Sequence, residues 1–103
     1  MRISKMLARG NMMKYEVHVR KLCEDDVSRD CHFPTTDQEA YETQLAALAS
    51  DIGSLPEINA TLVVKDSIQI DCNMPEKELL DYMKHLFSDY FCRVRYLSIN
   101  EVA

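Results

Sequence analysis

The chain has 103 residues, of which 47% are apolar and 28% are charged, and 12 Lys and Arg stand against 17 Asp and Glu for a net charge of −5. Collagen, disorder and membrane-spanning helices are excluded, because there are only 2 glycines and no apolar run approaches the roughly 18 residues that a bilayer needs. A chain of this length can bury one sizeable core. We therefore expect a single acidic, soluble domain over residues 14–103, preceded by a basic arm at residues 1–13.

The charge is distributed unevenly along the chain. Residues 1–21 hold six basic side chains and one acid, whereas no Lys or Arg occurs between Asp30 and Val64. An acidic stretch of this kind repels nucleic-acid phosphate and attracts basic surfaces. We predict a protein partner with a basic surface and not a nucleic acid, although such acids can also serve solubility alone. The candidate interaction residues on the predicted acidic helix are Asp37, Glu39, Glu42 and Asp51.

The four cysteines form no Cys-x-x-Cys pair. Cys72 and Cys92 fall in apolar-patterned segments, where a free thiol behaves as a small hydrophobic group. The N-terminus also lacks the apolar region and cleavage site of a secretory signal. We therefore predict reduced cysteines, no disulfide framework and a cytoplasmic location.

The first half of the chain predicts a strand, a loop and a helix. Residues 14–22 alternate apolar and polar side chains, which is typical of a half-buried strand. Residues 23–35 have no sustained period and are predicted to be a loop. Its acidic run lacks the pattern of a calcium loop and is interpreted as solvated charge; it consists of Glu24, Asp25, Asp26 and Asp30. Thr36 and Glu39 form a capping box for a helix that would end at Gly53 in a left-handed stop.

The second half predicts a hairpin, a helix and a last strand. Residues 58–72 alternate again, and a three-residue loop at 65–67 would place the apolar side chains of both strands on one face. Asn73 is the expected cap of a helix whose apolar stripe runs to Phe91. In the last strand, at residues 92–99, Val94 and Tyr96 are expected to point inward and Arg93 and Arg95 outward.

The predicted order is strand, helix, strand, strand, helix, strand. This α+β order is that of the ferredoxin-like fold, a four-stranded antiparallel sheet with both helices on one face. The bare face of such a sheet would then gather basic side chains beside Glu16, Gln69 and Asp71. They could bind an anion, or they could simply pair with carboxylates on neighbouring strands. These candidate anion-binding residues are His18, Arg20, Arg93 and Arg95.

Most catalytic chemistry lacks its residues in this sequence. The outward positions of the central strands carry no aromatic platforms for RNA bases, and neither glycine belongs to a phosphate-binding loop. His85 has Asp81 and Asp89 four residues away on either side, a spacing that favours surface pairing over a catalytic dyad. Candidate zinc ligands match no compact zinc spacing; they are His18, Cys23, Cys31 and His32. We predict no enzyme activity, no cofactor and no metal.

Two hypotheses for function remain. The first is a non-enzymatic interaction module of the inhibitor, antidote or adaptor type, which docks through the acidic helix or the open sheet face. The alternative is a regulatory domain that binds a small molecule or anion on the basic open face. A homodimer through the bare face or an edge strand is compatible with both.

Overall fold

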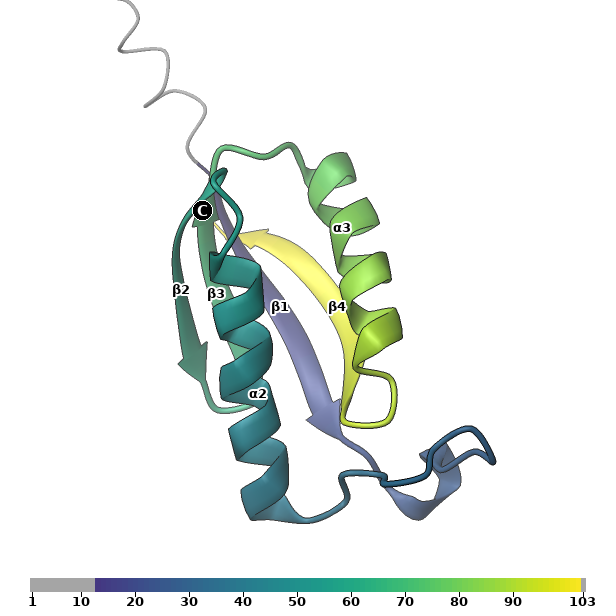
Figure 1. The fold of residues 1–103 in the computed structure, drawn as a ribbon. Helices are drawn as coiled ribbons and strands as arrows, with labels where there is room; N and C mark the ends of the chain where they lie inside the picture. Colours follow the sequence, from purple (N-terminus) through teal and green to yellow (C-terminus); the bar gives the residue numbers. More distant parts are fainter. Residues whose placement is uncertain (1–12, 103) are drawn as a thin grey trace, which may run out of the picture.

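The structure is a computed structural model and describes residues 13–102, so the expected basic arm lies outside the described residues except for Met13. The fold is α+β, with two α-helices and an antiparallel sheet in the described part of the chain, which confirms the predicted class (Figure 1). The elements in chain order are β1 (Met13–Lys21), the short 3-10 helix η1 (Glu24–Asp26), α2 (Gln38–Gly53), β2 (Ile58–Val64), β3 (Ser67–Cys72), α3 (Glu76–Asp89) and β4 (Val94–Val102).

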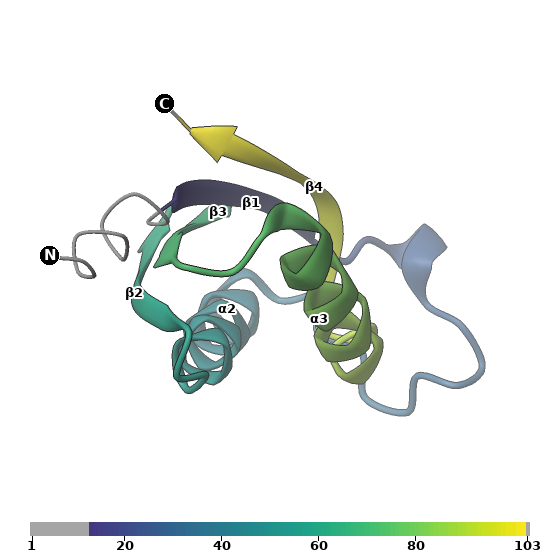
Figure 2. The ribbon, with the colours of Figure 1, turned by 90° about the horizontal axis from the view of Figure 1, so that it is seen from above.

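The molecule has two layers. Within residues 13–102 the sheet has four antiparallel strands in the order β2-β3-β1-β4. Figure 2 shows α2 and α3 lying side by side against one face of the sheet, while the opposite face carries no helix. Because β2 and β4 are the outer strands of this order, each has one edge without a neighbouring strand.

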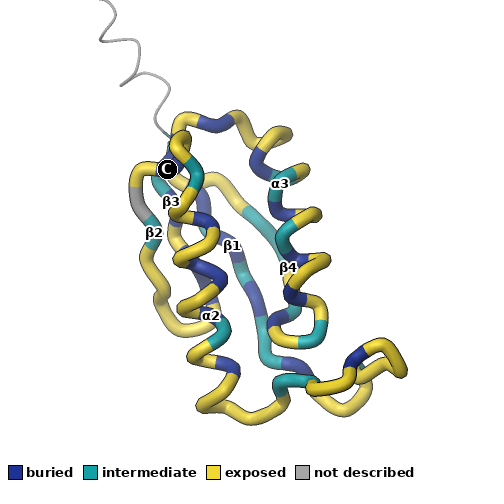
Figure 3. Tube along the Cα trace, in the orientation of Figure 1, coloured by how far each residue is buried: buried dark blue, intermediate teal, exposed yellow. Residues whose placement is uncertain are grey.

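The core lies between the helices and the covered face of the sheet (Figure 3). The alternation predicted for β1 is confirmed, since Tyr15, Val17 and Val19 are almost fully buried on the side of the helices. The helices bury one stripe each, as the three-to-four residue spacing predicts. The buried helix residues include Tyr41, Leu45, Leu48 and Ile52 on α2 and Leu79, Met83 and Phe87 on α3.

The hairpin of β2 and β3 differs from the expected one. Val64 pairs with Ser67, so the turn has two residues, Lys65 and Asp66, and the predicted three-residue loop is wrong. Leu62 and Val64 consequently lie on the open face of the sheet and not among the core residues. Ile58 is still buried because the pairing shifts by one residue between Ile58 and Ala60.

The turn itself supplies the physical reason. Lys65 adopts a positive φ of 55°, as tight two-residue hairpin turns that match the strand twist require. Asp66 is also held from two sides: its carbonyl accepts a hydrogen bond from the Val19 amide at 2.9 Å, and its Oδ1 accepts one from the Tyr41 hydroxyl at 2.9 Å. These contacts hold the two-residue turn against β1 and α2.

The ends of α2 also differ from the prediction. Asp37 and not Thr36 is the N-cap, because its carboxylate accepts a hydrogen bond from the Ala40 amide at 3.0 Å. Gly53 is the last helical residue and does not have a positive φ, so it is no left-handed stop. A Cβ at Gly53 would lie 3.3 Å from Thr61 Oγ1, so the glycine allows β2 to approach the helix closely.

The start of α3 also differs from the prediction. Pro75 occupies the N-cap position in place of Asn73, and no side chain caps this helix. The last strand begins two residues later than expected and extends to Val102. Tyr96 points to the helix side, as expected, and its ring lies 5.3 Å from that of Phe87.

A disulfide joins Cys31 to Cys92, which overturns the expectation that these thiols are free. The loop after β1 folds back beside the turn between α3 and β4, and this brings the two Cα atoms to 5.5 Å. The Thr35 amide donates to the Cys92 carbonyl at 2.8 Å in the same place. Spacing could not reveal the pair, because it is separated by 61 residues. Cys23 is exposed and Cys72 is buried, and both are free.

The disulfide predicts a large effect on stability. Loss of a cross-link across this separation frees the unfolded chain, so the variant C31S/C92S should lose about 2–4 kcal/mol of unfolding free energy. Denaturant unfolding measures this loss, with Cys23→Ser as a control that replaces an exposed free thiol by a hydroxyl, which can still donate to Asp26. A reducing agent should destabilise the wild type and leave C31S/C92S unchanged. An equal effect of reductant on both proteins would contradict the bond.

Candidate functional site

The open sheet face brings together three of the four expected basic residues. Glu16 and His18 lie opposite Gln69 and Ser67 on β3, and Arg20 lies opposite Arg95 on β4. Arg93 is placed elsewhere: it precedes β4, and its guanidinium lies 5.3 Å from the centre of the Tyr90 ring. Of the four expected anion-binding residues, His18, Arg20 and Arg95 therefore share the open face and Arg93 does not.

Asp26 already binds the two clustered arginines. Arg20 donates to both carboxylate oxygens of Asp26, at 2.5 and 2.8 Å, in a bidentate ion pair. Arg95 donates from Nη2 to the Asp26 carbonyl at 2.8 Å, and its Nε lies 3.7 Å from Oδ1. The interpretation of Asp26 as solvated charge was therefore wrong.

The 3-10 helix η1 positions this carboxylate. The Cys23 amide and thiol both donate to Asp26 Oδ2, at 2.8 and 3.2 Å, so Asp26 closes a capping box with Cys23. Hydrogen bonds from Arg20 and then from Cys23 hold the pKa of Asp26 well below its usual range. The same ion pair raises the pKa of Arg20 further. The three-residue spacing of Cys23 and Asp26 was the sequence signal for this arrangement, but a cysteine is not a typical cap.

The remaining charges of the open face are also matched. Glu16 Oε1 and His18 Nε2 lie 2.9 Å apart, and Lys14 is paired in register with Asp71. In formal charge the face holds three cationic side chains (Lys14, Arg20 and Arg95) and three carboxylates (Glu16, Asp26 and Asp71). The open face is close to neutral in a chain whose net charge is −5.

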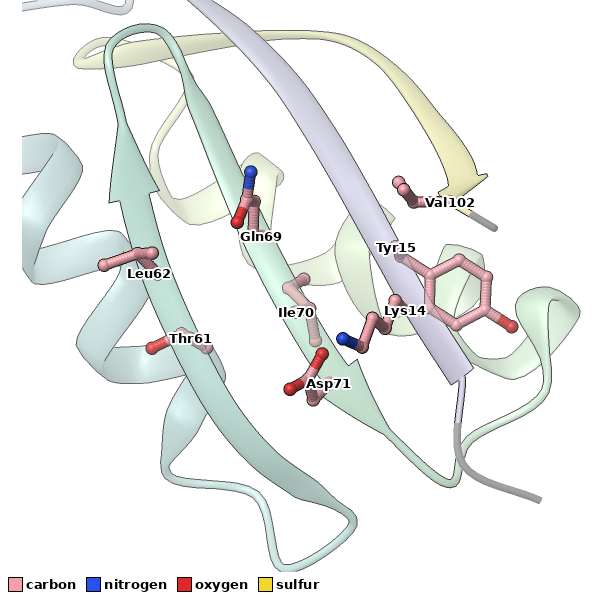
Figure 4. Close-up of a pocket in the computed structure, with 8 residues that line it drawn as sticks. All are labelled: Lys14, Tyr15, Thr61, Leu62, Gln69, Ile70, Asp71 and Val102. Atoms are coloured by element: carbon pink, nitrogen blue, oxygen red, sulfur yellow. The ribbon is translucent and has the colours of Figure 1, made fainter. Parts of the chain in front are cut away.

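A shallow hollow of about 410 Å³ lies on the open face, at the end where β1 begins (Figure 4). Lys14 and Asp71 lie in its middle, and Leu62 on β2 and Val102 on β4 lie on either side. Three apolar side chains on this face are exposed to solvent: Leu62 (59%), Val64 (40%) and Val102 (43%). The face is therefore apolar at both edges and polar in the middle.

The acidic helix keeps only part of its expected surface. Glu39 and Glu42 are exposed, and Asp37 is exposed but also caps the helix. Asp51 instead has a structural role, since its carboxylate accepts a hydrogen bond from the Tyr90 hydroxyl at 2.6 Å. Burial and then this hydrogen bond raise the pKa of Tyr90 to about 12. Asp51 therefore ties α2 to the end of α3.

The described part of the chain was predicted to hold no metal site, and two of its features bear on metal ions and membranes. Among residues 13–102, no three His, Cys, Asp or Glu side chains are grouped so that they could hold a metal ion. Cys31 cannot be a zinc ligand while it is bonded to Cys92. Neither α2 nor α3 is both long enough and apolar enough to cross a membrane.

Comparisons of this chain with protein-family models, with curated proteins and with solved structures found no match. Function must therefore be argued from the residues and their geometry.

The Asp26 cluster predicts a pH dependence. Because the pKa of Asp26 is lowered on folding from an unfolded value of about 3.9, its stabilisation is complete at neutral pH and is lost as the pH falls below about 4. Asp26→Asn should therefore lower the unfolding free energy at pH 7 and flatten its decline towards acid. Denaturant unfolding at a series of pH values measures both effects. The neighbouring substitution Asp25→Asn is the control, and an identical pH profile for the two variants would contradict the prediction.

Proposed function

We propose that this protein is a small non-enzymatic interaction module, of the inhibitor, antidote or adaptor type, that docks on a basic protein surface through the first half of α2. The observation that carries the proposal is the contrast between its two charged surfaces. Glu39 and Glu42 are exposed and take part in no ion pair within the described residues. The clustered arginines, by contrast, are already bound to Asp26.

The geometry of α2 supports this assignment. Gln38 donates to Glu42 at 2.9 Å, and the Glu39 carbonyl accepts from Thr43, so the acidic turn is held by its own neighbours. No Lys or Arg occurs on α2, so its field is not compensated within the helix. Uncompensated charge of one sign steers a partner of the opposite sign and gives a salt-dependent association. Asp51 is left out of the proposed surface because Tyr90 engages it.

The proposed docking predicts the effect of charge reversal. The variant E39K/E42K should bind basic partners at least about tenfold more weakly, because attraction becomes repulsion at the same site. The measurement is capture of proteins from a native lysate by the immobilised chain at low and high salt, followed by titration of the captured protein.

The matched control is E78K/D81K, which makes the same charge change on exposed positions of α3. Capture should survive in this control and disappear for the wild type at high salt. Equal capture by E39K/E42K and the wild type would remove the acidic helix from consideration.

The alternative, an anion-binding regulatory domain, has one observation in its favour. Arg95 Nε is buried and has no hydrogen-bond acceptor among the described residues. An anion would nevertheless have to displace Asp26, which holds Arg20 through two hydrogen bonds. We therefore rank this function second.

The alternative predicts a response to ligands. Phosphates, nucleotides or carboxylates that bind the folded chain must raise its thermal midpoint. Asp26→Asn, which opens the arginines, should increase that shift, whereas Asp25→Asn should not. No shift for the wild type or for Asp26→Asn across the panel would exclude an anion site at this cluster.

We also propose that the architecture is ferredoxin-like. The alternation of strands and helices and the strand order β2-β3-β1-β4 support this assignment. The architecture is shared by unrelated functions, so it adds no support for either function. A cytoplasmic location is not part of the proposal, because the Cys31–Cys92 disulfide is of a kind that reducing compartments rarely preserve.

A further inference from the structure

The strand β2 has apolar side chains on both of its faces. Val63 faces the helix side, whereas Leu62 and Val64 face the open side because of the two-residue turn. Strands with apolar residues on both faces are typical of sheets that are covered on both sides. Here α2 covers only one side (Figure 2). Leu62 and Val64 therefore give the uncovered side of β2 an apolar surface that another chain could cover.

The apolar side chains of this face lie at both of its edges. Leu62 and Val64 lie on β2, and Val102 lies on β4 beside the start of β1. The hollow of about 410 Å³ lies between Leu62 and Val102, so it has room for side chains from a partner (Figure 4). A covering surface with apolar side chains at matching positions would bury all three residues.

Charge selects the partner. A second copy of this chain carries the same net charge of −5 and is repelled by any strongly acidic surface. The acidic turn of α2 is therefore unsuitable for self-association. The open face is different, because the formal charges of Lys14, Arg20 and Arg95 there are offset in number by those of Glu16, Asp26 and Asp71. A second copy can approach this face without net repulsion.

The area of the open sheet face sets the expected strength of association between two copies. Four strands at a spacing of about 4.8 Å, each about eight residues long at about 3.3 Å per residue, give a projected area of roughly 500 Å². Standard interfaces bury about 800 Å² of accessible surface per partner, and smaller ones are weak. The face is thus large enough for a reversible dimer but not for an obligate one.

We propose that the open sheet face is a self-association surface, on which a second copy of this chain packs face to face about a two-fold axis. Each copy meets the same patch on the other, as a two-fold interface requires. Leu62, Val64 and Val102 of each copy become buried in the contact. Both acidic helices remain on the outside, so the proposal goes beyond the docking function of α2 and does not depend on it.

Sedimentation over about a hundredfold range of concentration tests the proposal. We expect a reversible equilibrium between one chain and two, with the dimer favoured at the upper end. It should persist at high salt, because salt weakens charge pairs between surfaces and not apolar contacts. A wild-type protein that remains a single chain throughout would overturn the proposal. So would a dimer that dissociates on addition of salt.

Matched variants then locate the surface. Leu62→Lys should raise the dissociation constant at least about tenfold, since it places two cations in an apolar contact. Ala46→Lys makes the same charge change on an exposed position of α2 and should leave the dimer intact. Both substitutions lower the net negative charge, so general repulsion cannot explain a loss of the dimer.

A second variant tests the same face at a position where a folding defect is not expected. Val102→Lys lies at the far edge of the face and near the end of the chain, away from the core. It should weaken the dimer in the same direction while circular dichroism and the unfolding midpoint stay unchanged. Folded Leu62→Lys and Val102→Lys proteins that dimerise like the wild type would overturn the assignment of this face. Loss of lysate capture by E39K/E42K is a separate result, because that variant leaves the open face intact.

Discussion

The turn between β2 and β3 decides what the bare face of the sheet presents. Its two residues fix the pairing of Val64 with Ser67, and a shift of one residue would move every side chain of β2 to the other face. Asp66 is bound by the Val19 amide and the Tyr41 hydroxyl, so the turn is attached to the core on which both helices pack. The exposure of Leu62 is therefore a consequence of the fold and not of a loose edge.

The charges of Arg20 and Arg95 on the sheet are also controlled by a local contact. The two guanidinium groups that meet across β1 and β4 would repel each other, and Asp26 prevents this by accepting hydrogen bonds from both. The carboxylate of Asp26, positioned by the three-residue helix η1, thus offsets one of the two positive charges in the most basic part of the sheet. Glu39 and Glu42, which have no ion-pair partner within the described residues, lie on α2, on the helix side of the sheet. The open sheet face and the acidic surface of α2 therefore differ in charge because η1 ends at Asp26 and places this carboxylate beside the arginines.

Regular periods were sufficient to predict much of this fold. The alternation of Tyr15, Val17 and Val19 and the stripe of Leu79, Met83 and Phe87 identify their elements, because each pattern matches only one secondary structure. The prediction of the hairpin turn was wrong because β2 is apolar at consecutive positions, so alternation does not distinguish its two faces. Turn length then decides, and a non-glycine residue with positive φ at Lys65 gave no strong sequence signal.

The errors in the candidate site arise from contacts between distant residues. Nothing in the spacing of Cys31 and Cys92 indicates a bond, because the pairing depends on the path of the whole loop after β1. The helical pattern places Asp51 on the acidic surface of α2, but only the packed structure brings Tyr90 to it. A residue type and a helix position identify a candidate charge. Whether that charge is available to a partner depends on which neighbour the fold places beside it, and for Asp26 and Asp51 the neighbour has already engaged it.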